Sequence, residues 1–322
     1  MIKRATAAQR RLMAIVLTVC LAAACGSDDS DNAIDEVALE DIETESRTFV
    51  DRSRPTRPNG TFPGSDERTI ATRIWFAPEP LDRPACRGQR CALVVLAHGF
   101  GGSTARFDAI ARRLAVAGYV VAAPAFPLTN QNAPGGHLTA FGDVVSQPAD
   151  LSFVLDRLLE ANENRDDVLH ERIDSERVAA LGHSLGGATV IAASRSDCCR
   201  DDRVGATLLV APASFIVAGS FGGPYATDGP PTLTVVGSAD PLVSPASVAP
   251  FVTAIEPPKI YLELQGGDHV FIIEATEEVL DPLLDRTADM SIAFLDRSFA
   301  GVDAVAEVAA DLRAEGHTVV ID

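Results

Sequence analysis

Positive charge is scarce in this chain of 322 residues, in which 27 lysine and arginine residues stand against 45 aspartate and glutamate residues. Lysine occurs only at Lys3 and Lys259. The formal net charge is −18 at pH 7, and so acidic a surface repels phosphate backbones. We therefore expect no nucleic-acid partner.

Long apolar runs are scarce as well. The N-terminal run Leu12–Ala24 has thirteen residues, whereas a membrane-spanning helix needs about 20. Hydrophobic residues make up 47% of the chain and charged residues 22%, which is the balance of a globular protein with one large core. This composition excludes a wholly disordered chain and a polytopic membrane protein.

The N-terminus has the pattern of an export signal. Small residues follow the apolar run up to Cys25, and basic residues precede it, namely Lys3, Arg4, Arg10 and Arg11. The stretch Leu21–Cys25 resembles a bacterial lipoprotein box, in which the cysteine is lipidated and becomes the new N-terminus. We expect residues 1–24 to be removed and Cys25 to anchor the exported protein to a membrane, on the cell surface or facing the periplasm. The alternative is plain secretion after cleavage near Ala22–Ala24.

An acidic segment follows the signal. Between Gly26 and Asp51 there are ten acidic residues and one basic residue, Arg47, with little apolar periodicity. Such a segment repels itself and stays solvated. We expect residues 25–46 to form a disordered tether and residues 47–322 to form the catalytic domain.

Export decides how the cysteines are interpreted. Cys20 lies in the signal and Cys25 is the lipidation candidate. The other cysteines are even in number, namely Cys86, Cys91, Cys198 and Cys199. An oxidising compartment makes disulfides their expected state. The first two enclose a short loop that suits a clip, and the last two either bridge each other or cross to the first pair. The spacing is not that of a zinc site, and we expect neither a metal nor a cofactor.

The body of the chain alternates strand and helix patterns. Helical periodicity covers residues 105–117, 148–161 and 287–299, and short apolar or β-branched runs predict strands at 69–76, 92–97, 119–123, 177–181, 206–210, 233–236 and 259–264. This alternation predicts an α/β fold with a doubly wound, mainly parallel sheet and helices on both faces. In such sheets the chemistry lies on loops just beyond the carboxyl ends of the strands.

A nucleophile motif directly follows the strand 177–181. The segment Gly182–Gly187 reads Gly-His-Ser-Leu-Gly-Gly and leads into a helix of small residues. This is a Gly-x-Ser-x-Gly turn between a strand and a helix, where the glycines permit the sharp turn that presents the serine hydroxyl above the sheet. The helix start behind it offers free N–H groups. Ser184 is therefore the candidate nucleophile.

A serine hydroxyl becomes a nucleophile when a base takes its proton. For this turn the chain order is serine, acid, histidine, so the base should follow Ser184. Only two histidines do so. His269 follows the strand 259–264 on the right kind of loop, whereas His317 lies in the C-terminal tail. We predict His269 as the base.

The acid that orients the base should lie on another such loop. Asp240 follows the strand 233–236 through Gly237–Ala239. Asp268 is a rival, but it adjoins His269, and neighbouring side chains orient each other poorly. Asp228 lies before its strand, on the wrong side. We predict the triad to be Ser184, Asp240 and His269.

The oxyanion of an acyl-transfer intermediate needs two backbone N–H donors. One should come from Leu185, the residue after the nucleophile. The other should come from the loop His98–Gly102 after the strand 92–97, and we predict Phe100. His98 precedes the nucleophile, and its predicted role is to support this loop.

These motifs resemble the α/β-hydrolase superfamily over roughly Arg47 to Gly301. The segment Asp51–Pro58 before Arg68, together with the two loops just described, resembles bacterial esterases grouped with chlorophyllases and platelet-activating-factor acetylhydrolases. The stretch Lys259–His269 is similar to bacterial cutinases and polyester hydrolases. In those enzymes the residues that match Phe100 and Leu185 donate the two oxyanion N–H groups, and the first is an aromatic.

Two features depart from the polyester hydrolases or limit the site. Those enzymes carry a tryptophan after the strand equivalent to 206–210, where this chain has Ala211–Ser214, and its only tryptophan is Trp75. About 22 residues separate Val210 from Leu233, too few for a large lid domain. The site is therefore expected to be open.

The sequence thus predicts an exported serine hydrolase that cleaves carboxylic esters with short-to-medium acyl groups through an acyl-enzyme. Its substrate would be a small-molecule, lipid or polyester ester, in the manner of the cutinases and polyester hydrolases, and the protein would be a monomer. Two alternatives remain at this point. One is an amidase or peptidase on the same triad, and the other is a non-catalytic surface binding protein on a hydrolase scaffold.

Overall fold

The computed structural model describes residues 37–273 and 282–322. The predicted signal, Cys25 and the predicted tether up to residue 36 lie outside the described residues.

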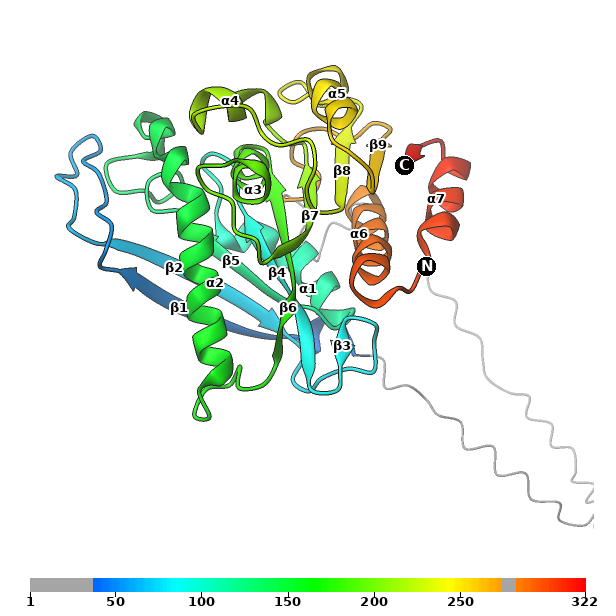
Figure 1. Ribbon diagram of the computed structural model, residues 1–322, viewed down its shortest axis with the longest axis horizontal. Helices are drawn as coiled ribbons and strands as arrows, with labels where there is room; N and C mark the ends of the chain where they lie inside the picture. The colour runs from blue at the N-terminus through cyan, green and yellow to red at the C-terminus, as the bar shows by residue number, and fades with distance from the viewer. Residues whose placement is uncertain (1–36, 274–281) are drawn as a thin grey trace, which may run out of the picture. The chain divides into compact units, whose positions relative to one another are not determined.

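Its strands form one 10-stranded sheet in the order β1-β2-β5-β4-β6-β7-β8-β9-β10, with β3 paired to β4 (Figure 1). Neighbouring strands are parallel from β5 to β9 and antiparallel at both edges. The strands are β1 (Glu43–Asp51), β2 (Arg68–Phe76), β3 (Cys86–Arg87), β4 (Arg90–Ala97), β5 (Val120–Ala125), β6 (Ile173–His183), β7 (Val204–Val210), β8 (Thr232–Gly237), β9 (Lys259–Leu264) and β10 (Thr318–Ile321). The mainly parallel, doubly wound sheet is confirmed.

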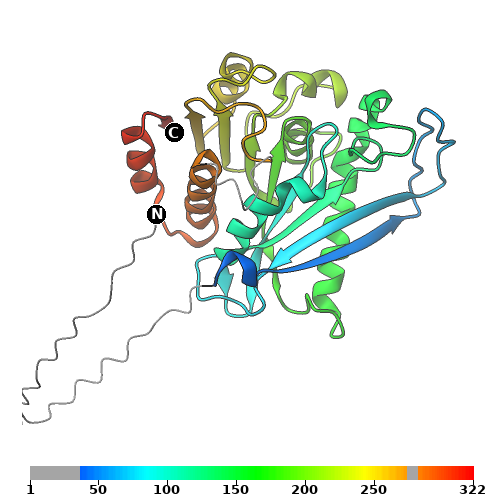
Figure 2. The ribbon, with the colours of Figure 1, turned by 180° about the vertical axis from the view of Figure 1, so that it is seen from behind.

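Helices cover both faces of this sheet (Figures 1 and 2). One core layer includes residues of α1, α6 and α7, and the other includes residues of α2 and α3. The α-helices are α1 (Asp108–Val116), α2 (Gln147–Glu163), α3 (Leu185–Arg195), α4 (Val217–Ser220), α5 (Pro245–Ala254), α6 (Pro282–Ala300) and α7 (Val305–Ala314). Between β7 and β8 the chain forms a 3-10 turn (η5, Ser214–Ile216) and α4, so these residues build no lid domain.

The tether prediction was wrong at its C-terminal end. Strand β1 begins at Glu43 and pairs along its whole length with β2, and Ile42 just before it is 4% exposed. An edge strand is held mainly by main-chain hydrogen bonds, and its outward side chains can all be charged. Its composition therefore resembles that of a solvated leader.

The end of strand β5 and two whole elements also differ from expectation. Strand β5 continues through Pro124 to Ala125, because its pairing with β4 ends at Ala122 and only β2 lies beside the proline. The sequence analysis did not predict α7 or β10. Both are short, and β10 adds an antiparallel strand beyond β9.

A buried ion cluster joins β2 to the start of α2. The guanidinium of Arg68 is 1% exposed and donates to both oxygens of Asp143 at 3.0 and 2.9 Å. It also donates to both oxygens of Asp150 at 2.7 and 2.6 Å. Burial alone would lower the pKa of Arg68, but the hydrogen bonds to Asp150 and Asp143 raise this pKa above its ordinary value. The cluster fixes where α2 begins.

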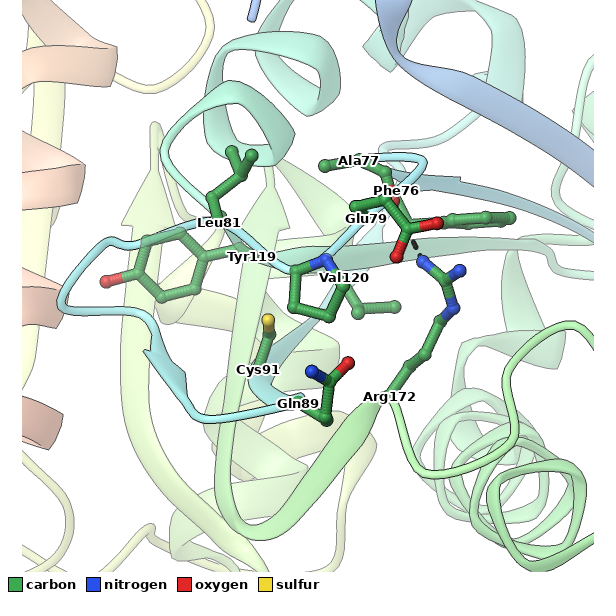
Figure 3. Close-up of a pocket in the computed structure, with 11 residues that line it drawn as sticks. Phe76, Ala77, Glu79, Leu81, Gln89, Cys91, Tyr119, Val120 and Arg172 are labelled. Carbon is green, nitrogen blue, oxygen red and sulfur yellow. Dashed lines mark hydrogen bonds between the residues drawn. The ribbon is translucent and has the colours of Figure 1, made fainter. Parts of the chain in front are cut away.

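The amino ends of the central strands are closely packed. A cavity of only about 10 Å³ lies there, between Cys91, Tyr119 and Arg172 (Figure 3). A space of this size holds at most one water molecule. It lies at the opposite end of the parallel strands from Ser184, and it is a packing gap.

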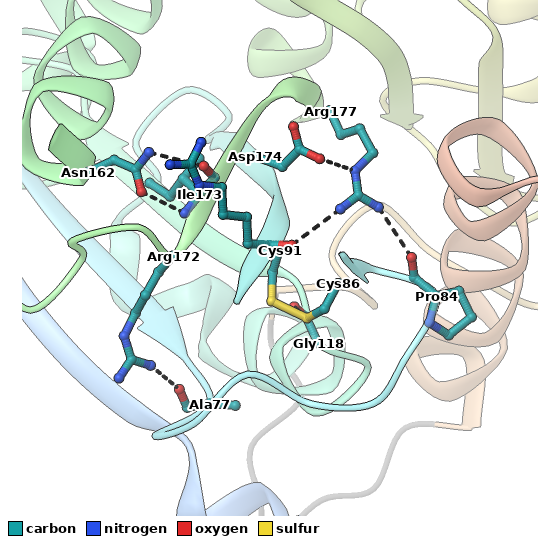
Figure 4. Close-up of a disulfide and its surroundings, with 11 residues drawn as sticks. Ala77, Pro84, Cys86, Cys91, Gly118, Asn162, Arg172, Ile173, Asp174 and Arg177 are labelled. Carbon is teal, nitrogen blue, oxygen red and sulfur yellow. Dashed lines mark hydrogen bonds and ion pairs between the residues drawn. A yellow bond between two sulfur atoms is a disulfide. The ribbon is translucent and has the colours of Figure 1, made fainter. Parts of the chain in front are cut away.

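The four remaining cysteines form two disulfides, each within its own pair. Cys86 is bonded to Cys91, which closes the β3–β4 hairpin (Figure 4). Cys198 is bonded to Cys199 in the turn between α3 and β7. The cross-linked alternative, which the sequence left open, is not formed. Arg177 donates to the carbonyls of Pro84 (Figure 4) and Arg90, which holds this hairpin against β6.

Candidate active site

Ser184 stands on a strained turn between β6 and α3. Its φ of 55° and ψ of −117° lie in a backbone region that residues other than glycine rarely adopt. Two backbone hydrogen bonds of 3.0 Å hold it, from the Ser184 N–H to the Val210 carbonyl and from the Ala213 N–H to the Ser184 carbonyl. Strain of this kind persists where the surroundings enforce it.

The glycines on either side make that turn sterically feasible. A Cβ added to Gly182 would lie 2.3 Å from the carbonyl oxygen of Gly186. A Cβ added to Gly186 would lie 2.0 Å from the carbonyl oxygen of Ala97, at the end of β4. Both distances are far below van der Waals contact. The strand and the helix therefore approach as closely as the Gly-x-Ser-x-Gly motif predicts.

The structure brings the three predicted triad residues together. Oγ of Ser184 lies 2.9 Å from Nε2 of His269, and Nδ1 of His269 lies 2.7 Å from Oδ2 of Asp240. The Asp240 side chain has no exposed surface. Its Oδ1 accepts the N–H groups of Leu242 and Val243, each at 2.8 Å. These two bonds aim Oδ2 at the imidazole and satisfy a buried carboxylate.

The rival residues lie elsewhere. Asp268 is exposed, and its carboxylate accepts the N–H of Val270 at 2.9 Å. Asp228 is exposed and interacts with Arg195. His317 accepts the N–H of Gln265 through Nδ1 at 3.1 Å. Thus neither other acid meets the His269 ring.

The two segments that carry the predicted oxyanion donors adjoin the nucleophile. A Cβ added to Gly99 would lie 3.1 Å from the Cβ of Ser184, so the loop that carries Phe100 adjoins the serine. Leu185 follows Ser184 as the first residue of α3. Neither the Phe100 N–H nor the Leu185 N–H donates to another atom in the described part of the chain. Both are free to bind a substrate oxygen.

His98 uses both ring nitrogens on the main chain. Nδ1 donates to the Gly99 carbonyl at 2.8 Å, and Nε2 accepts the N–H of Phe126 at 3.0 Å. Burial lowers the pKa of His98 to about 4, so the ring is neutral at pH 7. It fixes the loop before Phe100 and contacts no triad residue by hydrogen bond.

His183 is a supporting residue that the sequence analysis missed. Its Nε2 donates to the main-chain carbonyl of His269 at 2.8 Å, which ties the loop of the base to β6. Burial, with the neighbouring His269 as a second cause, lowers the pKa of His183 to about 4. Its place directly before the nucleophile, at the carboxyl end of a strand, is the signal that could have revealed it.

A pocket of about 320 Å³ opens above Ser184 and His269, with Phe100, Leu242 and Ile273 among its apolar walls. Loops after the carboxyl ends of β5, β7 and β8 expose large apolar side chains. These are Leu138, Phe141, Val145, Phe215 and Leu242, each at least 40% exposed. The ring of Phe141 packs edge-on against Phe100 at 5.6 Å, so this apolar rim, the five residues just named, continues into the pocket.

The described residues contain neither a metal-site cluster nor a helix that could span a membrane. Among them, no three His, Cys, Asp or Glu side chains cluster as a metal site would require. Residues 37–273 and 282–322 also include no helix with the length and apolar character needed to cross a membrane.

Comparison with known proteins identifies the family. Residues 58–303 match the model of a family described as PET hydrolase-like, which is well over half of the chain. The chain belongs to the PET hydrolase-like family. None of the curated proteins matches it. The predicted resemblance to α/β-hydrolase esterases is thereby confirmed, and this PET hydrolase-like protein is an ester hydrolase.

A solved structure supports the fold of this PET hydrolase-like protein. A ferulic acid esterase from Streptomyces cinnamoneus superposes with a TM-score of 0.58 at 21% sequence identity. The match covers 82% of this chain and 91% of the esterase chain. The two proteins therefore share the α/β-hydrolase fold over nearly the whole esterase.

We expect acid to destabilise the fold through His98. Its pKa is about 4 in the folded state against an ordinary value of 6.5, so between these pH values the unfolded chain binds a proton that the folded chain does not. The stabilisation is complete above pH 6.5 and is lost as the pH falls toward 4. Denaturant unfolding at several pH values in this interval checks this expectation. Over the interval, the free energy of unfolding of His98→Gln should fall by on the order of 3 kcal/mol less than that of the wild type. Equal pH slopes in the two proteins would contradict the assignment.

Proposed function

We propose that this PET hydrolase-like protein is an exported, lipid-anchored serine carboxylic-ester hydrolase that acts through an acyl-enzyme. One observation carries the catalytic part, namely the chain of hydrogen bonds from Ser184 through His269 to Asp240 beneath an open pocket. A serine, a base and an orienting acid in this order form the arrangement that activates a hydroxyl for acyl transfer.

In the acylation step, Oγ of Ser184 attacks the ester carbonyl carbon while Nε2 of His269 takes the hydroxyl proton. Asp240 accepts the Nδ1–H of His269 and stabilises the imidazolium that forms. The carbonyl oxygen becomes an oxyanion, which the N–H groups of Phe100 and Leu185 bind. When the tetrahedral intermediate collapses, the C–O bond to the alcohol breaks and His269 returns its proton to that oxygen.

Deacylation repeats these steps with water as the nucleophile. His269 takes a proton from the water, the hydroxide oxygen attacks the acyl carbon, and the same two N–H groups bind the second oxyanion. The bond to Oγ of Ser184 breaks, and His269 returns the proton to Oγ. The products are a carboxylic acid and a regenerated serine.

The triad assignment predicts a strict hierarchy of variants. Ser184→Ala should abolish turnover of p-nitrophenyl esters with the fold intact, because Oγ is a reacting group. Asp240→Asn should lower kcat by roughly 10⁴-fold, because the imidazole loses the carboxylate that orients it. Asp268→Asn is the matched control and should stay within about tenfold of the wild type, because its carboxylate caps a main-chain N–H instead. If Asp268→Asn were the more damaging change, the acid assignment would be wrong.

The pocket and its surroundings favour apolar esters with short-to-medium acyl groups. Its volume is limited, Leu242 of the apolar rim lines it, Phe141 of the rim packs on its wall at Phe100, and no lid domain lies between β7 and β8. The segment after β7 lacks the tryptophan of the polyester hydrolases, but Phe215, 60% exposed, lies on it. An aromatic side chain is thus present beside the site, at a different position.

We expect kcat/KM to peak for acyl chains of about two to eight carbons. Each methylene that the pocket buries contributes about 0.8 kcal/mol, or roughly fourfold, and further methylenes find no wall. A series of p-nitrophenyl esters from acetate to palmitate measures this dependence. A maximum at the long-chain end would contradict the proposed acyl preference.

The export part of the proposal rests on the N-terminal sequence. Cells that express the full chain should hold the protein in the membrane fraction, because diacylglycerol on Cys25 anchors it. Cys25→Ser should move the protein to the soluble fraction, and Cys20→Ser is the matched control that should leave it in the membrane. Mass spectrometry of the N-terminus completes the test. A soluble wild-type protein that begins at another residue would contradict the lipid anchor.

A further inference from the structure

Gln147 is a buried amide that the triad does not use. It is the first residue of α2, and its side chain has no exposed surface. Its Nε2 donates to Oγ1 of Thr129 at 2.7 Å, and its Oε1 accepts from Oγ1 of Thr189. Both threonines are fully buried as well. The three side chains form a polar bridge inside the core.

The Thr129 end of this bridge lies beside the loop that carries Phe100, the first predicted oxyanion donor. The carbonyl of Thr129 accepts the N–H of Gly101 at 2.8 Å, and the N–H of Gln131 donates to the carbonyl of Gly102 at 2.8 Å. Residues 129–131 thus hold the loop that carries Phe100. A shift of Thr129 would move that loop with it.

The Thr189 end lies on α3, the helix that begins with Leu185, the second predicted oxyanion donor. Thr189 lies one turn after Leu185 on α3, and its Oγ1 is 3.3 Å from the Leu185 carbonyl. The first turn of α3 is the part of the helix that presents the Leu185 N–H. Gln147 therefore connects both donor segments through one side chain.

From this arrangement we propose that Gln147 is a positioning residue that sets the spacing between the Phe100 and Leu185 N–H groups. The inference rests on the proposed function and adds a residue to it. The two donors come from separate segments, yet each must lie about 3 Å from the same oxygen. A misplacement of about 1 Å in such a site costs on the order of 100-fold in rate.

The amide is itself held in place. Asp143 and Asp150, which flank Gln147 in the sequence, are both bound by the buried Arg68 on β2. The start of α2 is therefore fixed to the sheet, and the bridge has a rigid base. A buried amide without these partners would pay the desolvation cost of its polar atoms, which disfavours other rotamers.

The test compares two variants at opposite ends of α2. Gln147→Leu removes both bonds of the bridge, and we expect kcat to fall roughly 10- to 100-fold with KM within about threefold. Asn162→Leu is the matched control, because its buried amide also uses both ends, on the N–H and carbonyl of Ile173 (Figure 4). It should lower stability and leave kcat within about twofold of the wild type.

Threonine variants separate the hydrogen bonds from packing. Thr129→Val and Thr189→Val keep the side-chain shape and lose the hydroxyl, and each should lower kcat. Thr129→Ser and Thr189→Ser keep the hydroxyl and should restore most of it. The double variant Gln147→Leu with Thr129→Val should lose no more kcat than Gln147→Leu alone, because both changes break the same bridge.

Covalent labelling keeps the two proposals distinguishable. Stoichiometric reaction of Ser184 with a fluorophosphonate counts correctly folded sites, and kcat is expressed per labelled site. If the wild type is not labelled at Ser184, the proposed function fails. If Gln147→Leu is labelled fully and keeps kcat within twofold, or loses no more than Asn162→Leu, the positioning role is overturned. Should Gln147→Leu not fold, equal kcat values for the valine and serine variants would overturn it instead.

Discussion

The strained turn at Ser184 is the constraint on which the other parts of the site depend. It places Oγ above the sheet, starts α3 and leaves the Leu185 N–H free in one step. The close approach of Gly186 to β4 brings the loop of Phe100 to the same point. The remaining components, His269 and Asp240, arrive on the carboxyl ends of the next strands of the sheet, so their convergence follows from the parallel order β6-β7-β8-β9.

Much of the fold could be predicted because the central strands are buried on both faces and appear as continuous apolar runs. The edges could not be predicted in this way. Strand β1 reads as an acidic leader, since its register with β2 depends on main-chain bonds that leave no trace in composition. Helix α7 and strand β10 could not be predicted either, because both are short. Their place in the fold depends on packing against α6 and β9 rather than on a strong local pattern.

The site shows the same division. A motif and a chain order predicted the serine, the base and the acid, because those rules describe the loops that the strands must present. The supporting residues carry no such rule. His183 bonds to His269, which lies 86 residues away in the sequence. Gln147 bonds to Thr129, which lies 18 residues away. Only the packed structure shows that their partners lie in reach.

The two edges of the sheet also bear on how copies of this protein meet. An edge strand with unpaired main-chain groups can act as a template for a strand of another chain. On one side β1 carries the charged side chains Glu43, Glu45 and Arg47 along nine residues, and charged side chains on an edge strand discourage such pairing. On the other side β10 has only four residues. Both edges thus disfavour β-sheet association between copies of this protein.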